Sequence, residues 1–91
     1  MTYKTMLKMS VCSREIEDGI PIKEVQLHKH VELPIPPQIG IWLQDQCDTQ
    51  NVVIETVAIH GQSLIAILSP IQVGENRVDE IIVALKDSGW K

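Results

Sequence analysis

Two histidines at alternate positions are the residues whose type and spacing are best suited to chemistry. His28 and His30 are separated by one residue, and Glu32 follows two positions later. Alternate side chains of a β-strand point to the same face, so the two imidazoles and the carboxylate are expected to lie together. Zinc takes three or four such ligands, and His60, at the end of a later apolar run, is the remaining candidate. The spacing therefore predicts the metal site of a small metal-binding protein or enzyme as one alternative, and a solvated polar strand face as the other.

The two cysteines favour a structural over a catalytic role. Cys12 and Cys47 are far apart and fit neither a CxxC motif nor a zinc-finger spacing. Asp45 and Asp48 flank Cys47, and their carboxylates disfavour the reactive thiolate. The sequence also contains no GxSxG motif, glycine-rich phosphate loop or HExxH motif. We therefore expect a non-enzymatic protein without a cofactor, with reduced thiols in the cytoplasm.

The charges are distributed unevenly along the chain. The formal net charge is −4, and no Lys or Arg occurs between Lys29 and Arg77. Asp45, Asp48 and Glu55 fall in this span, and they predict an acidic surface that attracts a basic protein partner. The lack of cations, together with two Trp, one Tyr and no Phe, argues against nucleic-acid binding. We therefore expect a small acidic protein-binding module of the inhibitor or immunity type, with a solvated loop as the alternative.

Length and hydropathy limit the architecture. The 91 residues suffice for one small domain, residues 1–91, and 44% of them are apolar. No apolar run approaches the roughly 20 residues of a membrane-spanning helix, so we expect no membrane segment. A single core of this size is marginal, which favours association with a second subunit.

The elements that must position these residues follow from periodicity. Residues 3–11 and 25–33 alternate between apolar and polar side chains, which predicts two strands with one buried face each. The segment 13–21 contains Asp18-Gly19 and is expected to be a hairpin loop. Three prolines at 34, 36 and 37 end the second strand, and the chain is expected to re-enter the sheet at 39–43.

The second half of the chain predicts two further strands and a helix. Residues 52–60 and 64–73 are apolar at nearly every position, as in strands that are covered on both faces, and they are joined by a short turn at Gly61. A helix is expected to begin after Asn76 as N-cap, and to end at Gly89 so that Trp90 packs back on Leu85. Its apolar stripe is formed by Val78, Ile81, Ile82 and Leu85.

These elements predict an α+β fold with a mainly antiparallel five-stranded sheet, because all the connections are short. We expect the strands to follow one another as a meander, with the C-terminal helix packed on one face. One short helix cannot cover both faces of the two apolar strands, so the surplus apolar surface predicts a homodimer. A structural subunit of a larger assembly is the alternative.

Overall fold

A pair of long antiparallel strands forms one side of the sheet in the computed structural model, which describes residues 2–43 and 52–91. Strand β1 (Tyr3–Ser13) pairs antiparallel with β4 (Glu24–Leu33) along its whole length. The alternation of the sequence is preserved in both strands. Leu7, Met9 and Val11 are buried on one face, while the even positions of β4 are exposed on the other. Both predicted strands are therefore confirmed.

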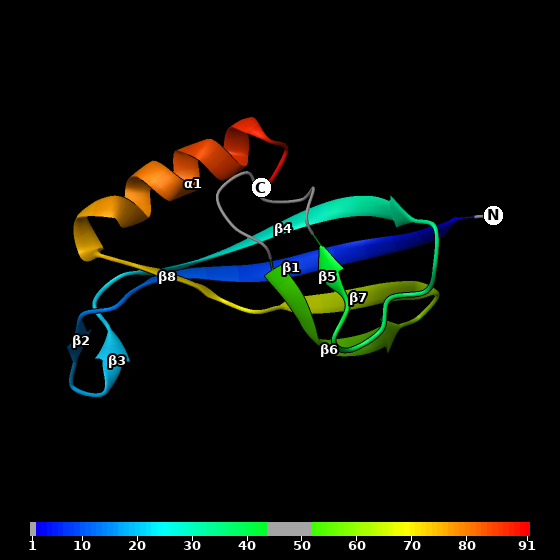
Figure 1. Cartoon of the computed structure of the whole chain (residues 1–91), viewed down its shortest axis with the longest axis horizontal. Helices are drawn as coiled ribbons and strands as arrows, with labels where there is room; N and C mark the ends of the chain where they lie inside the picture. Colours follow the sequence, from blue (N-terminus) through cyan, green and yellow to red (C-terminus); the bar gives the residue numbers. More distant parts are fainter. Residues whose placement is uncertain (1, 44–51) are drawn as a thin grey trace.

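The sheet is mixed, and the predicted meander is wrong. The strands β6 (Val52–His60) and β7 (Ser63–Leu68) form an antiparallel hairpin, and β7 pairs with β1 in parallel. With β5 (Trp42–Leu43) beside β6, the order is β4-β1-β7-β6-β5 (Figure 1). The α+β class and the mostly antiparallel sheet are confirmed. The meander fails because the chain crosses to the far edge of the sheet between β4 and β6, so that β7 returns beside β1.

The proline segment makes this crossing. It leaves β4 after Leu33, and the Gly40 N–H then donates to the Ile54 carbonyl at 2.8 Å, while the Ile54 N–H donates to Ile41 at 2.9 Å. The chain thus re-enters the sheet beside β6, close to the predicted position, although the strand proper is limited to β5. Pro37, within this segment, is buried.

A further proline divides the last apolar run. Residues 64–73 form two strands, β7 and β8 (Ile71–Val73), with Ser69 and Pro70 between them. Because Pro70 has no N–H to give to a ladder, the chain shifts there. Strand β8 continues along β1 in parallel, opposite Val11, Cys12 and Ser13.

The C-terminal helix covers one face of the sheet. A 3₁₀ turn, η1 (Glu75–Arg77), leads into α1 (Val78–Asp87), which contacts β1. The helix buries its predicted stripe against the buried face of β1. The predicted N-cap is wrong, because Asn76 lies inside η1 and makes no capping hydrogen bond. Instead the Glu75 N–H donates to the Glu15 side chain at 2.9 Å.

The end of the helix agrees with the sequence. Gly89 adopts φ +101°, and its N–H donates to the Lys86 carbonyl, while the Trp90 N–H donates to the Leu85 carbonyl at 3.1 Å. These are the two hydrogen bonds of a Schellman motif. Lys29 is the one polar residue at an odd position of β4, so it lies on the helix-covered face, where its Nζ donates to the Ser88 carbonyl at 2.9 Å.

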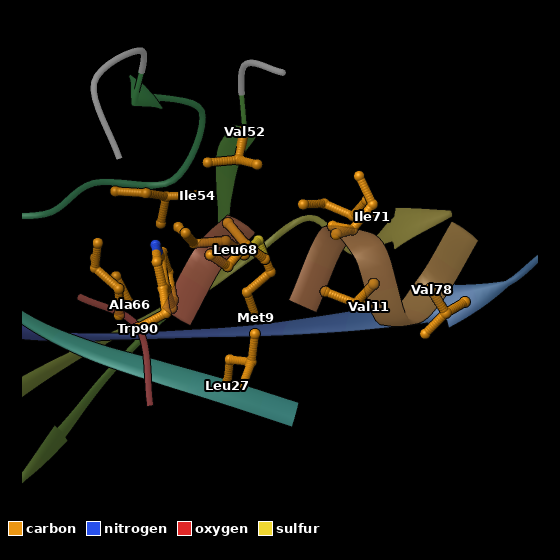
Figure 2. Close-up of a cluster of buried hydrophobic side chains, with 13 residues drawn as sticks. Met9, Val11, Leu27, Val52, Ile54, Ala66, Leu68, Ile71, Val78 and Trp90 are labelled. Carbon is orange, nitrogen blue, oxygen red and sulfur yellow. The ribbon is translucent and has the colours of Figure 1, made fainter. Parts of the chain in front are cut away.

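The core lies between the sheet and the helix. Trp90 is 2% exposed and belongs to one buried cluster with side chains from β1, β4, β6, β7, β8 and α1 (Figure 2). After the helix, Lys91 exchanges two backbone hydrogen bonds with His28 on the free edge of β4, each 2.9 Å long. The C-terminal turn therefore closes the core at this end.

Candidate functional site

The segment predicted as a hairpin loop is a small β-hairpin of its own. Strands β2 (Ile16–Glu17) and β3 (Ile20–Pro21) pair antiparallel, and Figure 1 shows them standing out from the sheet near the start of α1. The turn residues Asp18 and Gly19 have φ angles of 54° and 81°. Left-handed values at both central positions are typical of a type I′ turn, the tight turn that matches the twist of the flanking strands.

The base of this hairpin is fixed by several hydrogen bonds. The buried Ser13 hydroxyl donates to the Glu15 carbonyl at 2.9 Å and accepts from the Lys23 N–H at 3.2 Å. The Ile22 N–H donates to Glu15 at 3.1 Å, and the Glu15 carboxylate binds the first N–H of η1. Because both ends of the hairpin are held in this way, its tip is presented in one preorganised conformation.

The tip is apolar and acidic at once. Ile16 and Ile20 are 65% and 66% exposed, whereas side chains of this type are normally buried. Ile16 lies opposite Pro21 and Ile20 opposite Glu17, so the two isoleucines point to opposite faces of the hairpin. Glu17 and Asp18 are also exposed. From the sequence, this segment is expected to be only a hairpin loop, although Ile16 and Ile20 within an acidic turn are a visible sign of an exposed apolar tip.

The histidine pair lies where the alternation predicted. His28 and His30 are exposed on the helix-free face of β4, with ring centroids 6.0 Å apart and ring planes at 82°. Glu32 follows on the same face. His60 lies on β6, and β1 and β7 separate it from β4. At about 4.8 Å between neighbouring strands, the backbones of His30 and His60 are roughly 14 Å apart.

This spacing brings the first three candidates together on β4 and leaves His60 on the far side of a hollow that His30 and Glu32 also line. Within residues 2–43 and 52–91, no group of three or more His, Cys, Asp or Glu side chains is placed to hold a metal ion. The two rings of His28 and His30 are close enough to act as two ligands of one ion. A third protein ligand would have to come from a movement of Glu32 or from another chain.

Only part of the predicted acidic surface is described by the structure. Asp45 and Asp48 lie outside the described residues, as does Cys47. Glu55 is exposed at an irregularity of β6, between the pairs of Ile54 and Thr56 with β7. It lines an open hollow with Lys8 and His28 on the helix-free face of the sheet.

Cys12 is placed as a packing residue. Its side chain is free and buried at the end of β1. Burial raises the pKa of the Cys12 thiol, and the nearby Glu24 carboxylate raises it further, although a hydrogen bond with Gln72 acts in the opposite direction. A thiol held in its neutral form is a poor nucleophile.

Comparison with known proteins leaves the surface as the basis for assigning a function. No family model, curated protein or solved structure matches this chain. None of the helices in the described part of the chain is long and apolar enough to cross a membrane.

Proposed function

We propose that this chain is a non-enzymatic protein-binding module that inserts the β2–β3 hairpin into an apolar cleft of a protein partner. The observation that carries the proposal is the exposure of Ile16 and Ile20 on a fixed, protruding turn. Because they point to opposite faces, a partner must enclose the tip to bury both. A cleft satisfies this requirement, whereas a flat surface does not.

The charges of the hairpin define the rim of that cleft. Glu17 and Asp18 at the tip are acidic, so the partner is expected to carry Lys or Arg around the apolar site. If the cleft is the substrate site of an enzyme, the bound hairpin blocks it, and the chain acts as an inhibitor or immunity-type protein. Asp45, Asp48 and Glu55 add negative charge that accelerates the approach of a basic partner.

The test is affinity capture from native lysate, with tagged full-length protein and identification by mass spectrometry. The variant Ile16→Ser/Ile20→Ser removes the apolar tip, and Ile59→Ser is the matched control, since Ile59 is 74% exposed at the end of β6. A partner retained by the wild type and by the control, but lost by the double variant, supports the proposal. A partner captured equally by all three proteins refutes the hairpin as the binding element.

Capture at two salt concentrations separates the two components of the interface. Attraction between exposed charges weakens with salt, because the Debye length falls from about 10 Å at 0.1 M to about 3 Å at 1 M. Burial of isoleucine does not weaken in this way. We expect high salt to slow association and leave a complex that still depends on Ile16 and Ile20.

Metal binding at His28 and His30 is a second candidate, favoured by the 6.0 Å between their ring centroids. Two exposed imidazoles bind a divalent transition metal weakly, with Cu²⁺ preferred over Ni²⁺ and Zn²⁺. Calorimetric titration of untagged protein with Zn²⁺ and Cu²⁺ tests this candidate. Heat that disappears in His28→Ala/His30→Ala and persists in His60→Ala supports it, and an unchanged titration in both variants removes it.

A further inference from the structure

The face of the sheet opposite the helix is not covered by any residue within 2–43 and 52–91. We call it the open face. Three cross-strand rows define it, and each row runs from β4 through β1 and β7 to β6. The central row is His30, Met6, Ile65 and Ala58. The outer row is Glu32, Lys4, Ser63 and His60, and the third row, on the other side of the central row, is His28, Lys8, Ile67 and Thr56.

The middle of the open face is apolar and its ends are polar. Met6 and Ile65 are half-buried at the centre, and Ile67 beside them is 40% exposed. Two shallow hollows, of about 470 and 510 Å³, lie at the two ends of this apolar centre. An apolar centre inside a polar rim is the usual anatomy of a protein interface.

The rows become self-complementary under one symmetry operation. A twofold axis parallel to the strands, between β1 and β7, lays β4 of one copy over β6 of the other and β1 over β7. In the central row, Met6 then meets Ile65 of the second copy, and Ile65 meets Met6. In the outer row, the Glu32 carboxylate meets the His60 imidazole of the second copy, and this contact occurs twice.

We propose that the open face is the interface of a twofold homodimer, in which two sheets pack face to face. Two sheets packed in this way cross at about 30°, so contacts are closest near the central row and looser at the ends. Lys4 faces Ser63 and Lys8 faces Ile67, so no two lysines face each other directly. The arrangement thus buries the apolar centre without placing like charges in contact.

The charges of the open face favour a second copy over an unrelated partner. The ion pairs among residues 2–43 and 52–91 are Lys23–Asp79 and Arg77–Glu80, which lie elsewhere. Glu32 and His60 form no ion pair within the described chain, although Lys4 is the cross-strand neighbour of Glu32. The Glu32 carboxylate and the His60 imidazole are complementary groups at opposite edges of the same face. Complementary groups at the two edges of one face form contacts when the face packs on a second copy of itself about a twofold axis.

The interface is small, and this sets the expected affinity. Three rows of side chains are fewer than the roughly 20–30 residues a side of a standard interface, so we expect a dissociation constant on the order of micromolar. Each substitution changes both copies at once, because the contacts are isologous. A single variant therefore has a doubled effect on dimerisation.

The test is sedimentation equilibrium of the full-length protein from about 0.1 µM to about 1 mM, a range that extends on both sides of a micromolar dissociation constant. We expect the wild type to shift from monomer to dimer in this range. Ile65→Lys is expected to raise the dissociation constant at least about tenfold, because it brings two charges into the apolar centre. Ile59→Lys, on the opposite face of the sheet, is the matched control and is expected to leave it unchanged.

A charge exchange tests the symmetry and guards against variants that fail to fold. The substitution His60→Glu brings a carboxylate opposite Glu32 of the second copy and is expected to raise the dissociation constant of the dimer about tenfold. The double substitution Glu32→Lys/His60→Glu is expected to restore the affinity of the dimer. Both positions are exposed, and circular dichroism checks the fold. The proposal is overturned by a wild type that remains monomeric throughout, by dimers insensitive to Ile65→Lys, or by failure of the double variant to recover. These results leave the hairpin proposal untouched, because Ile16 and Ile20 are not part of the open face.

Discussion

Replacement of Trp90 by alanine is expected to remove a large part of the stability of the fold. Trp90 is 2% exposed and lies in the same buried cluster as Ile54, Ala66 and Leu68. Truncation of a buried Trp to Ala typically costs about 3–5 kcal/mol, since it removes apolar burial and leaves a cavity. The Trp90 backbone N–H, which closes the helix, is retained in the variant. The loss therefore reports on the side chain alone.

The total stability gives this loss its meaning. At about 0.05–0.15 kcal/mol per residue, a chain of 91 residues has a free energy of unfolding of roughly 5–14 kcal/mol. The variant is thus expected to remain folded with a markedly lower urea midpoint, or to be partly unfolded in buffer. Val83→Ala, at a helix position that is 60% exposed, is the control and is expected to change stability by less than about 0.5 kcal/mol.

Urea unfolding followed by far-ultraviolet circular dichroism measures the change, because tryptophan emission changes when Trp90 is removed. Both proteins carry Ile65→Lys, which is expected to keep them monomeric, so that mass-action stabilisation by dimer formation does not contribute. A loss below about 1 kcal/mol would refute the reasoning. It would mean that the C-terminal turn is not part of the cooperative core, and that the contact of Lys91 with His28 is a weak addition to the edge of β4.

Three further predictions concern single interactions. Lys29→Met keeps the aliphatic stem but removes the charged donor to the Ser88 carbonyl, so urea unfolding is expected to show that the free energy of unfolding falls by about 1 kcal/mol. The same change at an exposed lysine of the open face is expected to leave the free energy of unfolding almost unchanged. In the Cys47→Ser variant, the remaining Cys12 thiol is expected to react with a disulfide reagent more slowly than free cysteine, and to need a higher pH for the same rate, because its pKa is raised; a rate equal to that of free cysteine contradicts this. Asp45→Lys/Asp48→Lys is expected to slow association with the captured partner in stopped-flow measurements at low salt and to leave dissociation unchanged, so equal association rates count against the acidic surface.

Local patterns predicted most of the elements of this fold. The alternation of β4 and the apolar stripe of α1 are properties of short windows, and the structure places them as expected. Gly89 and Trp90 also form their motif within a few residues. In each case the determining contacts lie close in the sequence, so that periodicity and turn chemistry suffice to infer them.

The errors arise from contacts between distant residues. Asn76 provides no cap, and the first N–H of η1, that of Glu75, is instead bound by Glu15, which is remote in the sequence and is placed there by the base of the hairpin. The meander fails for the same reason, because the pairing of Gly40 and Ile41 with Ile54 decides at which edge the chain re-enters. Such contacts depend on the whole topology, and propensity does not contain them.

The candidate sites divide in the same way. The strand period predicted that His28, His30 and Glu32 share one face, but the distance to His60 depends on the strand order. The two isoleucines beside the Asp18-Gly19 turn are visible in the sequence, but their exposure is not, because isoleucines that flank a turn can fold back onto the core or remain exposed. The sequence shows which residues are available for a site, and the topology decides which of them meet.

The two proposed surfaces have a joint consequence that can be measured. A twofold axis parallel to the strands keeps both β2–β3 hairpins at the same end of the dimer, so the dimer is bivalent. Binding to a dense layer of immobilised partner is then expected to be tighter than binding to monomeric partner in solution by a factor of about 100 or more. Ile65→Lys is expected to abolish this difference and to leave the affinity for monomeric partner unchanged, because the hairpin itself is intact. Equal loss of both affinities in this variant would show that the open face contacts the partner directly, and the assignment of the two surfaces to separate roles would be wrong.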